Sequence, residues 1–398
     1  MAEPNSIRRA ALTVATAAAR LARGRATPFY LFDRETARAS LRRWRRATGG
    51  AEDVSLFYPW KCNRHAALVE LAREEGFGAE VTAEEDLRAA LVAWDGEVAA
   101  PGRAPRNVLF QGPAKSPAAL DAALSAGAWL VADSVEDAEA ILERARVMGV
   151  SPRYILRFRA ASSEPSQRGF GLTPRGVASF GARVAREGAP LPEGLAFHLG
   201  TGLASPASYV AAIREAGRLA GVLDSLGIAV RVLDAGGGFA AQGEARRDAR
   251  GRIRGRAASP EAFLRAIRAA AGRSLPGAQL LLEPGRAIAS DAFHLVTRVV
   301  RTTERRVYVD ASRMGHAFFV PRGRHPYRPV PRRPGRGSLE VRGPLPTNLD
   351  LFAERVSIGR PREGDLLVIE SVGAYNLIAA NAWSGGVPEV VELRDAEE

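Results

Sequence analysis

The chain contains two lysines, Lys61 in FYPWKCNRH and Lys115 in FQGPAKS, and uses arginine for its other cationic side chains. Arginine and lysine serve equally well as solvated charges, but only lysine can lose its proton at accessible pH and attack a carbonyl to form a Schiff base. The ordinary alternative for Lys61 is an ion-paired lysine at the end of a buried strand. Residues further along the chain favour the chemical role.

Three other groups could act together with Lys61: His198 in FHLG, the glycine run 236–238 in LDAGGGF, and Glu283 in LLLEPGR. Consecutive glycines let backbone N–H groups approach a phosphate, although a tight turn would explain such a run equally well. A carboxylate beside a pyridine nitrogen keeps that nitrogen protonated. An imidazole can lie against a ring, although it can also be a hydrogen-bonded core residue. The combination predicts pyridoxal phosphate as the cofactor, and no metal site.

These residues need elements that bring them together. From residue 28 onward, short apolar runs alternate with alanine-rich amphipathic segments, as in NVLFQG followed by SPAALDAALSAG. Seven or eight such units before residue 290 predict a (β/α)8 TIM-type barrel. An open Rossmann sheet is the alternative, but no GxGxxG opens a helix after the first strand. Reactive residues of a barrel gather at the carboxyl ends of its strands, where all four groups fall. Gly285 and Arg286 could add donors to the phosphate.

The chain divides into three predicted regions. Residues 1–26 predict a helical extension; two arginines precede an apolar run there, as in export signals, but Arg20 and Arg23 interrupt it. Residues 27–290 predict the cofactor-binding barrel. Residues 291–398 predict a β-rich domain, to which part of the N-terminal segment could belong. Within the barrel, the polar segment 241–259 has no periodicity and is expected to be an exposed or disordered insertion.

Composition narrows the function further. At 398 residues and 46% hydrophobic residues, the chain is long enough for a barrel plus a smaller domain. The net charge of +12 is spread along the chain, which argues against a nucleic-acid surface. The single cysteine, Cys62, excludes an intrachain disulfide and suits the cytoplasm. No stretch has the length and apolarity of a membrane span. We therefore expect a cytoplasmic enzyme without nucleic-acid or membrane partners.

Together these motifs resemble the fold-type III pyridoxal-phosphate decarboxylases, which include the diaminopimelate and ornithine/arginine decarboxylases. The resemblance covers residues 27 to 395. TPFYLFD resembles the opening strand of that family, FYPWKCN its YAxKAN lysine motif, and GFGAEVTAEEDL its GxGxDxxSxxEL segment. VLFQGPAKSPAAL follows the FxGxxKSxxEL pattern of the diaminopimelate branch. FHLGTG, LDAGGGF and EPGR stand where the family has its ring-stacking histidine, its phosphate-binding glycines and its pyridine-nitrogen glutamate.

The resemblance implies roles for further residues. It makes Lys61, His198 and Glu283 the catalytic group. It places Glu80 and Arg157 near the cofactor, and Tyr375 at the phosphate or substrate. It also implies a head-to-tail homodimer, in which the C-terminal domain of one subunit completes the site of the other.

One segment departs from the family pattern. Where the family has GPxCxSxD, with an interface cysteine and in some members an acid that binds a distal ammonium, this chain reads GPLPTNLD. Pro346 replaces the cysteine, Thr347 stands at the acidic position, and Asp350 remains. Cys62 cannot be assumed to substitute, because a strand neighbour of Lys61 should point the other way. Specificity for diaminopimelate or ornithine is therefore not expected.

The predicted substrate-binding residues favour an anion. Arg322 and Arg324, together with His325, lie in FFVPRGRHPYRP, and a guanidinium fork would bind a distal carboxylate or phosphate. In an arginine-rich chain these residues could equally be solvated surface charges. With Thr347, Asp350 and Tyr375 they complete the predicted substrate site.

The predicted activity is α-decarboxylation of an amino acid or an amino-acid derivative other than diaminopimelate. The alternatives are a pyridoxal-phosphate-dependent racemase and a non-catalytic homologue that binds the cofactor. A racemase of the alanine-racemase type has an arginine facing the pyridine nitrogen, so Glu283 argues against it. Retention of Lys61 argues against a non-catalytic homologue.

Overall fold

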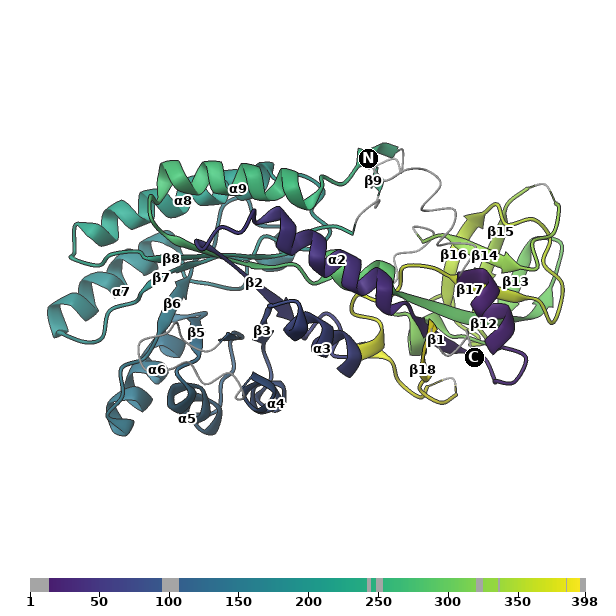
Figure 1. Ribbon diagram of the computed structural model, residues 1–398, viewed down its shortest axis with the longest axis horizontal. Helices are drawn as coiled ribbons and strands as arrows, with labels where there is room; N and C mark the ends of the chain where they lie inside the picture. Colours follow the sequence, from purple (N-terminus) through teal and green to yellow (C-terminus); the bar gives the residue numbers. More distant parts are fainter. Residues whose placement is uncertain are drawn as a thin grey trace. The chain divides into compact units, whose positions relative to one another are not determined.

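The computed structural model describes residues 14–94, 107–241, 245–247, 253–319, 325–335, 337–383 and 385–393. The chain forms two compact units (Figure 1). The barrel unit comprises Ser40–Lys61 and Val69–Ala287. The β unit comprises Met1–Ala39, Cys62–Leu68 and Ile288–Glu398.

The barrel unit contains a closed barrel of parallel strands in the order β11-β2-β3-β4-β5-β6-β7-β8, which confirms the predicted fold class. The strands are β2 (Val54–Pro59), β3 (Gly78–Val81), β4 (Val108–Phe110), β5 (Trp129–Ala132), β6 (Tyr154–Arg157), β7 (Gly194–Ala196), β8 (Val232–Gly237) and β11 (Gln279–Glu283). Alternate residues of these strands fill the interior with apolar side chains such as Phe57, Leu109 and Ile155.

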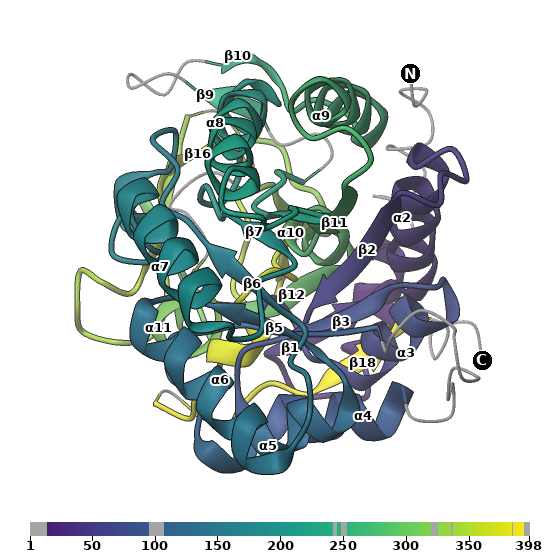
Figure 2. The same ribbon diagram turned by 90° about the vertical axis from the view of Figure 1, so that its left-hand side faces the viewer.

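The helices of the barrel alternate with its strands, and Figure 2 shows α4 to α9 around them. They are α2 (Arg34–Ala47), α3 (Ala66–Glu74), α4 (Glu84–Trp94), α5 (Pro117–Ala126), α6 (Val135–Met148), α7 (Pro174–Glu187), α8 (Ala207–Asp224), α9 (Pro260–Ser274) and the short α10 (Arg286–Ala289), with a 3-10 turn at Pro165–Gln167. The first residues of α2 and α3 and the last of α10 belong to the β unit.

Local signals in the sequence set the ends of several helices. Ser116, Thr173 and Ser259 each cap a helix whose first residue is proline, and each accepts a bond from the backbone N–H three residues later. Proline suits this position because its missing N–H would have no helical partner. Glycines with positive φ end three of the helices: Gly127, Gly149 and Gly188.

The β unit is built on an eight-stranded sheet. Its strands are β1 (Phe29–Phe32), β12 (Phe293–Thr302), β13 (Arg306–Val309), β14 (Tyr327–Val330), β15 (Leu339–Arg342), β16 (Leu351–Val356), β17 (Leu366–Ile369) and β18 (Val390–Glu392). The unit also has the short helix α11 (Arg313–His316) and 3-10 turns at Ser290–Ala292 and Leu377–Ala379. Residues 14–21 are helical and pack their apolar face on this unit.

Two sequence-based expectations need revision. The run FYLF was expected to open the barrel region at residue 27, but it forms β1, which pairs antiparallel with β12 and parallel with β18 in the β unit. The segment 241–259 was expected to be an exposed or disordered insertion. It contains an antiparallel pair of strands, β9 (Ala245–Arg247) and β10 (Ile253–Arg256), so disorder does not describe these residues. At the other boundary the β unit begins at Ile288, close to the expected residue 291.

Among the described residues, no helix combines the length and apolarity that crossing a membrane requires. The same part of the chain contains no cluster of histidine, cysteine, aspartate or glutamate that could hold a metal ion.

Candidate active site

The candidate site lies at the carboxyl ends of the barrel strands. Lys61 follows β2, Glu80 lies in β3, and Arg157 ends β6. His198 follows β7, the glycine run closes β8, and Glu283 ends β11. Parallel strands in a closed barrel deliver their carboxyl ends to one face, so segments far apart in the sequence meet there.

Lys61 lies between two carboxyl groups. Its Nζ is 2.7 Å from Oε1 of Glu80 and 3.8 Å from Oε2 of Glu283. Glu80 is fully buried, and its Oε2 has no hydrogen-bond partner, whereas the Lys61 side chain is 32% exposed. The amine is therefore accessible to a reagent in the barrel mouth, with a buried acceptor atom beside it.

Glu283 belongs to a buried group of polar side chains. The amide of Gln111 donates to Glu283 Oε1 and, at 3.4 Å, to Asp234 Oδ2. Burial and, to a smaller extent, the neighbouring Asp234 carboxyl raise the pKa of Glu283 to about 8. Burial likewise raises the pKa of Asp234 to about 6 and that of Glu80 to about 7. These carboxyl groups can hold a proton near neutral pH. A pyridine nitrogen beside Glu283 could take up that proton and leave the carboxylate that keeps the nitrogen charged.

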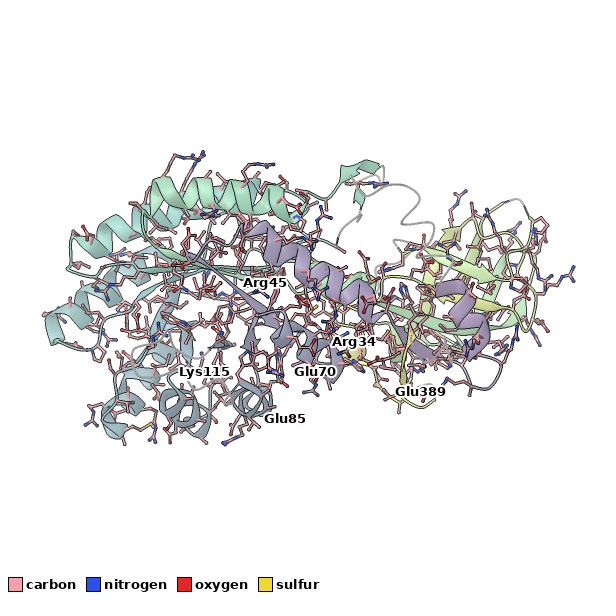
Figure 3. The ribbon with its side chains drawn as sticks, viewed as in Figure 1. Arg34, Arg45, Glu70, Glu85, Lys115 and Glu389 are labelled. Carbon is pink, nitrogen blue, oxygen red and sulfur yellow. The ribbon has the colours of Figure 1, made fainter. Side chains whose placement is uncertain are left out.

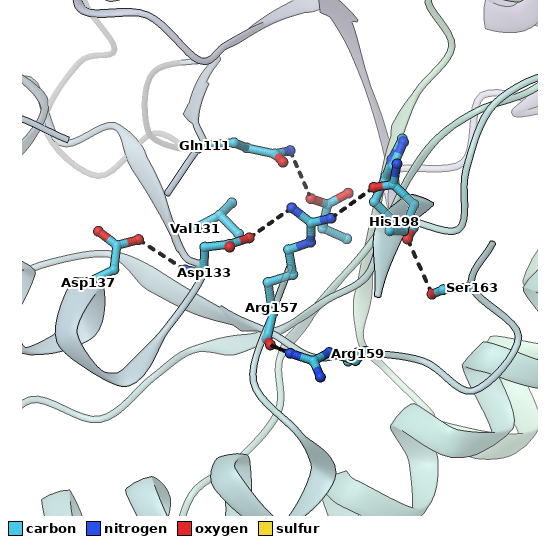
Figure 4. A network of polar contacts seen from close by, with 12 residues as sticks. Gln111, Val131, Asp133, Asp137, Arg157, Arg159, Ser163 and His198 are labelled. Carbon is cyan, nitrogen blue, oxygen red and sulfur yellow. Dashed lines mark hydrogen bonds and ion pairs between the residues drawn. The ribbon is translucent and has the colours of Figure 1, made fainter. Parts of the chain in front are cut away.

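His198 lies beside the glycine run. Desolvation in the barrel mouth, together with the charges of Lys61 and Arg157, lowers the pKa of His198 to about 3. The imidazole is therefore neutral, and it can lie against an aromatic ring without adding positive charge. The carbonyl oxygen of His198 accepts a bond from Ser163 Oγ at 3.4 Å (Figure 4).

The three glycines at the end of β8 allow close approach of neighbouring backbone. Gly236 and Gly238 have φ of 67° and 96°, which other residues rarely adopt. A Cβ on Gly236 would lie 2.5 Å from the carbonyl oxygen of Phe197, and one on Gly238 would lie 2.2 Å from that of Gly200. No other residue fits these two positions without a shift of the backbone.

Part of the expected phosphate cradle is already engaged. The N–H of Gly236 donates to Asp234 Oδ1 at 2.8 Å. The N–H of Gly285 donates to the carbonyl oxygen of Glu283 at 2.9 Å. Nε of Arg286 donates to Thr201 Oγ1 at 3.0 Å. The two backbone N–H groups reach a phosphate only if these bonds are exchanged or shared, whereas a guanidinium has other N–H donors besides Nε. Phosphate binding by Gly285 and Arg286 stays a prediction.

Arg157 forms an ion pair with Asp133. Its NH1 is 2.8 Å from Asp133 Oδ1, and its NH2 is 3.3 Å from Gln167 Oε1 (Figure 4). Its charge nevertheless acts on the site, because it helps to lower the pKa of His198 and opposes the rise in the pKa of Glu80 that burial causes.

Pyridoxal phosphate fits this set of side chains. Lys61 supplies an accessible amine, Glu283 a buried acid for the pyridine nitrogen, and His198 a neutral ring. Glu80 Oε2 is a buried acceptor in need of a partner, and the glycine run gives a surface without side chains for a phosphate.

Comparison with known proteins agrees with this fit. The model of the pyridoxal binding domain of the pyridoxal-dependent decarboxylases matches residues 34–290. This chain belongs to that family. It is therefore a pyridoxal-phosphate-dependent amino-acid decarboxylase, a carboxy-lyase, which sets aside the racemase and the non-catalytic homologue.

The alignments with individual relatives cover most of the length of this decarboxylase. Diaminopimelate decarboxylase of Deinococcus radiodurans is 30% identical over 90% of this chain and 87% of its own. The L-glutamyl-[BtrI acyl-carrier protein] decarboxylase of Niallia circulans is 27% identical over 92% of this chain and 88% of its own. Among solved structures, diaminopimelate decarboxylase of Helicobacter pylori, complexed with L-lysine, has the same fold, with a TM-score of 0.80 at 22% identity, over 94% of this chain and 97% of that one.

The remaining predicted site residues of the decarboxylase belong to the β unit. Tyr375 has a φ of 67°, and its N–H donates to the carbonyl oxygen of Cys62 at 2.7 Å. Nδ1 of His325 lies 3.0 Å from the carbonyl oxygen of Glu370. Thr347 Oγ1 accepts a bond from the N–H of Leu349 at 3.2 Å. Arg322 and Arg324 lie outside the described residues.

Asp350 has a different environment from the one expected of a substrate ligand. It is fully buried, and its Oδ1 accepts bonds from Ser312 Oγ at 2.9 Å and from the N–H of Arg313 at 2.6 Å. Its Oδ2 accepts a bond from the N–H of Leu345 at 2.9 Å. Asp350 thus ties the start of α11 to the segment that contains Thr347, and this geometry does not support the expected contact with substrate.

Two functional residues were not assigned from the sequence, Gln111 and Asp234. Gln111 immediately follows β4, and Asp234 precedes the glycine run within the quoted LDAGGGF. The position of a polar residue at the carboxyl end of a barrel strand could have indicated that it belongs to the site. Its partner could not be inferred, because β4 and β11 lie far apart in the sequence.

The buried carboxyls give a testable dependence of stability on pH. Because the pKa values of Glu80, Asp234 and Glu283 are raised on folding, the folded chain binds more protons than the unfolded chain between about pH 4 and 8. Their contribution to stability is present at low pH and is lost as pH rises through the folded pKa values. We expect the melting temperature of the cofactor-free protein to fall by several degrees between about pH 5 and 8.

Calorimetry of cofactor-free wild type and Glu283→Gln at matched pH values would measure this effect. The variant lacks one of the three titrating groups, so its melting temperature should depend less steeply on pH. Equal slopes in the two proteins would mean that Glu283 titrates normally.

Proposed function

We propose that this decarboxylase acts on an amino acid or amino-acid derivative whose side chain ends in an anionic or acylated group, not in an ammonium. The observation that carries the proposal is the environment of Asp350. Asp350 is the sole acidic residue of the segment 343–351. Its carboxylate is buried, and both of its oxygens accept backbone hydrogen bonds, Oδ1 from Arg313 and Oδ2 from Leu345. The family resemblance places this segment near the substrate. An ammonium group on the substrate would therefore find no available carboxylate in it.

Two further facts support an anionic or acylated substrate. The chain carries a net charge of +12, and Arg322 and Arg324 fall in the segment that the resemblance brings near the substrate. The relative from Niallia circulans is named for an L-glutamyl group carried on a protein, so at least one relative acts on an acidic amino acid in acylated form.

The residues of the barrel mouth have separate tasks in this reaction. Lys61 would hold the cofactor through its amine, the group that the amine of the substrate would replace. When bound, pyridoxal phosphate supplies a protonated ring that accepts the electron pair released as CO2 departs. Glu283 keeps the proton on the pyridine nitrogen, and Gln111 and Asp234 orient Glu283. His198 excludes water from one face of the ring while remaining neutral. The amine of Lys61 would also be the group that displaces the product amine.

Proton delivery to the substrate Cα differs from the family pattern in our proposal. Pro346 stands where the family has its cysteine, and proline has no side-chain proton to give. Lys61 is the candidate donor, since its amine regains a proton when the substrate replaces it.

We also propose that the enzyme is a cytoplasmic homodimer with shared sites. The resemblance supports the dimer, and the lone cysteine supports a reducing compartment. Sedimentation should give about twice the 42.5 kDa of one chain. A monomer that is fully active would contradict shared sites.

A substrate panel tests the proposed specificity. Release of CO2 should be measured from lysine, ornithine, arginine and diaminopimelate, and from glutamate, aspartate, phosphoserine and carrier-linked glutamate. We expect kcat/KM to be at least about tenfold higher for one of the anionic or acylated compounds, because a charge-assisted pair contributes about 1.5–3 kcal/mol. A preference for an ammonium-bearing substrate over all of these would contradict the proposal.

Variants of the two arginines refine this test. Arg322→Ala and Arg324→Ala should each lower kcat/KM for the preferred anionic substrate by about tenfold. Arg305→Ala, which removes an exposed arginine elsewhere in the β unit, serves as the matched control. If all three variants behave alike, the two arginines are surface charges without a role in substrate binding.

A further inference from the structure

Lys115, the second lysine, lies in the interior of the barrel unit (Figure 3). Its side chain is 1% exposed, and its Nζ donates to three oxygen atoms. These are the carbonyl oxygens of Gly112 at 2.6 Å and Val131 at 2.9 Å, and Oδ2 of Asp137 at 2.6 Å. An ammonium has three N–H donors, so every donor of this buried charge has an acceptor.

Asp137 connects Lys115 to the end of β5 through a hydrogen bond. Its Oδ2, which accepts from Lys115, also accepts from the backbone N–H of Asp133 at 2.9 Å. Its own N–H donates to Ser134 Oγ, the cap of α6, at 3.1 Å. Asp137 therefore fixes the backbone at Asp133, the residue that follows the last residue of β5.

Asp133 in turn holds Arg157. The two side chains form an ion pair at 2.8 Å, with exposed fractions of 7% and 12%. Figure 4 shows Asp137, Asp133 and Arg157 in sequence, with His198 on the far side of the guanidinium. Two ion pairs joined by one backbone hydrogen bond therefore connect the buried Lys115 to Arg157.

We propose that Lys115 and Asp137 are positioning residues of the decarboxylase, which hold Asp133 and thereby fix the guanidinium of Arg157 beside the cofactor site. The inference rests on the decarboxylase chemistry at Lys61. It assigns the two lysines distinct tasks, one as the reactive amine and the other as the anchor of the neighbouring cation.

The geometry explains why position 115 holds lysine in an arginine-rich chain. The three acceptors surround a single nitrogen at 2.6–2.9 Å. A guanidinium spreads five N–H donors over a plane and would leave several of them buried without acceptors. Lys115→Arg should therefore disturb the site although it retains the positive charge.

The test compares variants of this chain of contacts with a control ion pair. Lys115→Met keeps the length of the side chain and removes its donors, whereas Asp137→Asn removes the negative charge that pairs with Lys115. Arg144→Met and Asp121→Asn form the control, because that pair joins α5 to α6 at 2.7 Å and no contact with Asp133 or Arg157 is among its hydrogen bonds.

Two measurements separate positioning from simple stabilisation, both made well below the melting temperature. One is the affinity of the cofactor-free protein for pyridoxal phosphate, followed by quenching of tryptophan fluorescence. The other is the pH midpoint of the visible absorbance of the cofactor-loaded protein. For Lys115→Met and Asp137→Asn we expect an affinity about fivefold weaker, a shifted midpoint and a kcat about tenfold lower with KM changed less than about twofold. The control pair should leave all of these unchanged.

A double-mutant cycle with Arg157→Gln tests the route. If the effect passes through Arg157, Lys115→Met should shift the absorbance midpoint no further in the Arg157→Gln background. Additive shifts would overturn the inference, as would variants that lose thermal stability alone. If Lys115→Met does not fold, Asp137→Asn carries the same cycle. A wild-type protein that forms no adduct at Lys61 would instead overturn the decarboxylase assignment, so the two failures are distinguishable.

Discussion

Replacing Lys61 with alanine should abolish covalent attachment of pyridoxal phosphate and lower the decarboxylation rate by more than about a thousandfold. The amine is the one group of the barrel mouth that can bond covalently to the cofactor aldehyde. It is also the group expected to return a proton at the end of the reaction. The loss of these two functions should lower the decarboxylation rate far more than the loss of the contacts with Glu80 and Glu283.

The measurement is borohydride reduction of the loaded protein, followed by mass analysis of its peptides. In wild type the label should fall on Lys61 alone, since Lys115 is buried and its three donors are engaged. Lys61→Ala should bind the cofactor weakly and take no label. A label on Lys115, or a protein that never takes up the cofactor, would falsify the assignment of the site.

The second large effect is expected from Glu283→Gln. Glutamine can still contact the pyridine nitrogen but carries no charge, so the nitrogen should lose its proton and the ring much of its capacity to accept electrons. We expect kcat to fall at least about a hundredfold, roughly 3 kcal/mol of transition-state stabilisation, while the cofactor stays bound. The Gln111 amide can still donate to the new side-chain oxygen, so the fold should survive.

A carboxylate elsewhere in the barrel unit provides the comparison. Glu193→Gln removes the partner of Arg153, 3.4 Å away, without touching the candidate site. Its kcat and visible spectrum should match those of wild type. If Glu283→Gln also retains normal turnover, the buried carboxyl has only a structural role.

Local signals explain why the barrel could be predicted from the sequence. Serine or threonine followed by proline marks the start of α5, α7 and α9, and glycine marks the end of α5, α6 and α7. Each signal acts within a few residues and needs no knowledge of distant partners. The strand ends that follow this rhythm placed Lys61, His198 and Glu283 on one face.

The errors and omissions arise from contacts between distant segments. The run FYLF has the composition of a barrel strand, and only its pairing with β12 and β18 assigns it to the β unit. The environment of Glu283 depends on the hydrogen bond from Gln111, which follows β4, and on the carboxyl of Asp234 in β8. Asp350 looked available for substrate because its partners Ser312 and Arg313 lie nearly forty residues earlier. Local sequence patterns therefore predict where a helix or strand lies, but not which distant segments it contacts.

The burial of Lys115 also affects how the protein can be chemically modified. Apart from the α-amino group, an amine-selective reagent has two side chains to find, and one is 1% exposed while the other is 32% exposed. Acylating dyes, crosslinkers and immobilisation chemistries that target lysine should therefore react chiefly in the barrel mouth and inactivate the enzyme. Bound cofactor should protect Lys61 against them, so acylation measured at Lys61 itself would report the fraction of empty sites.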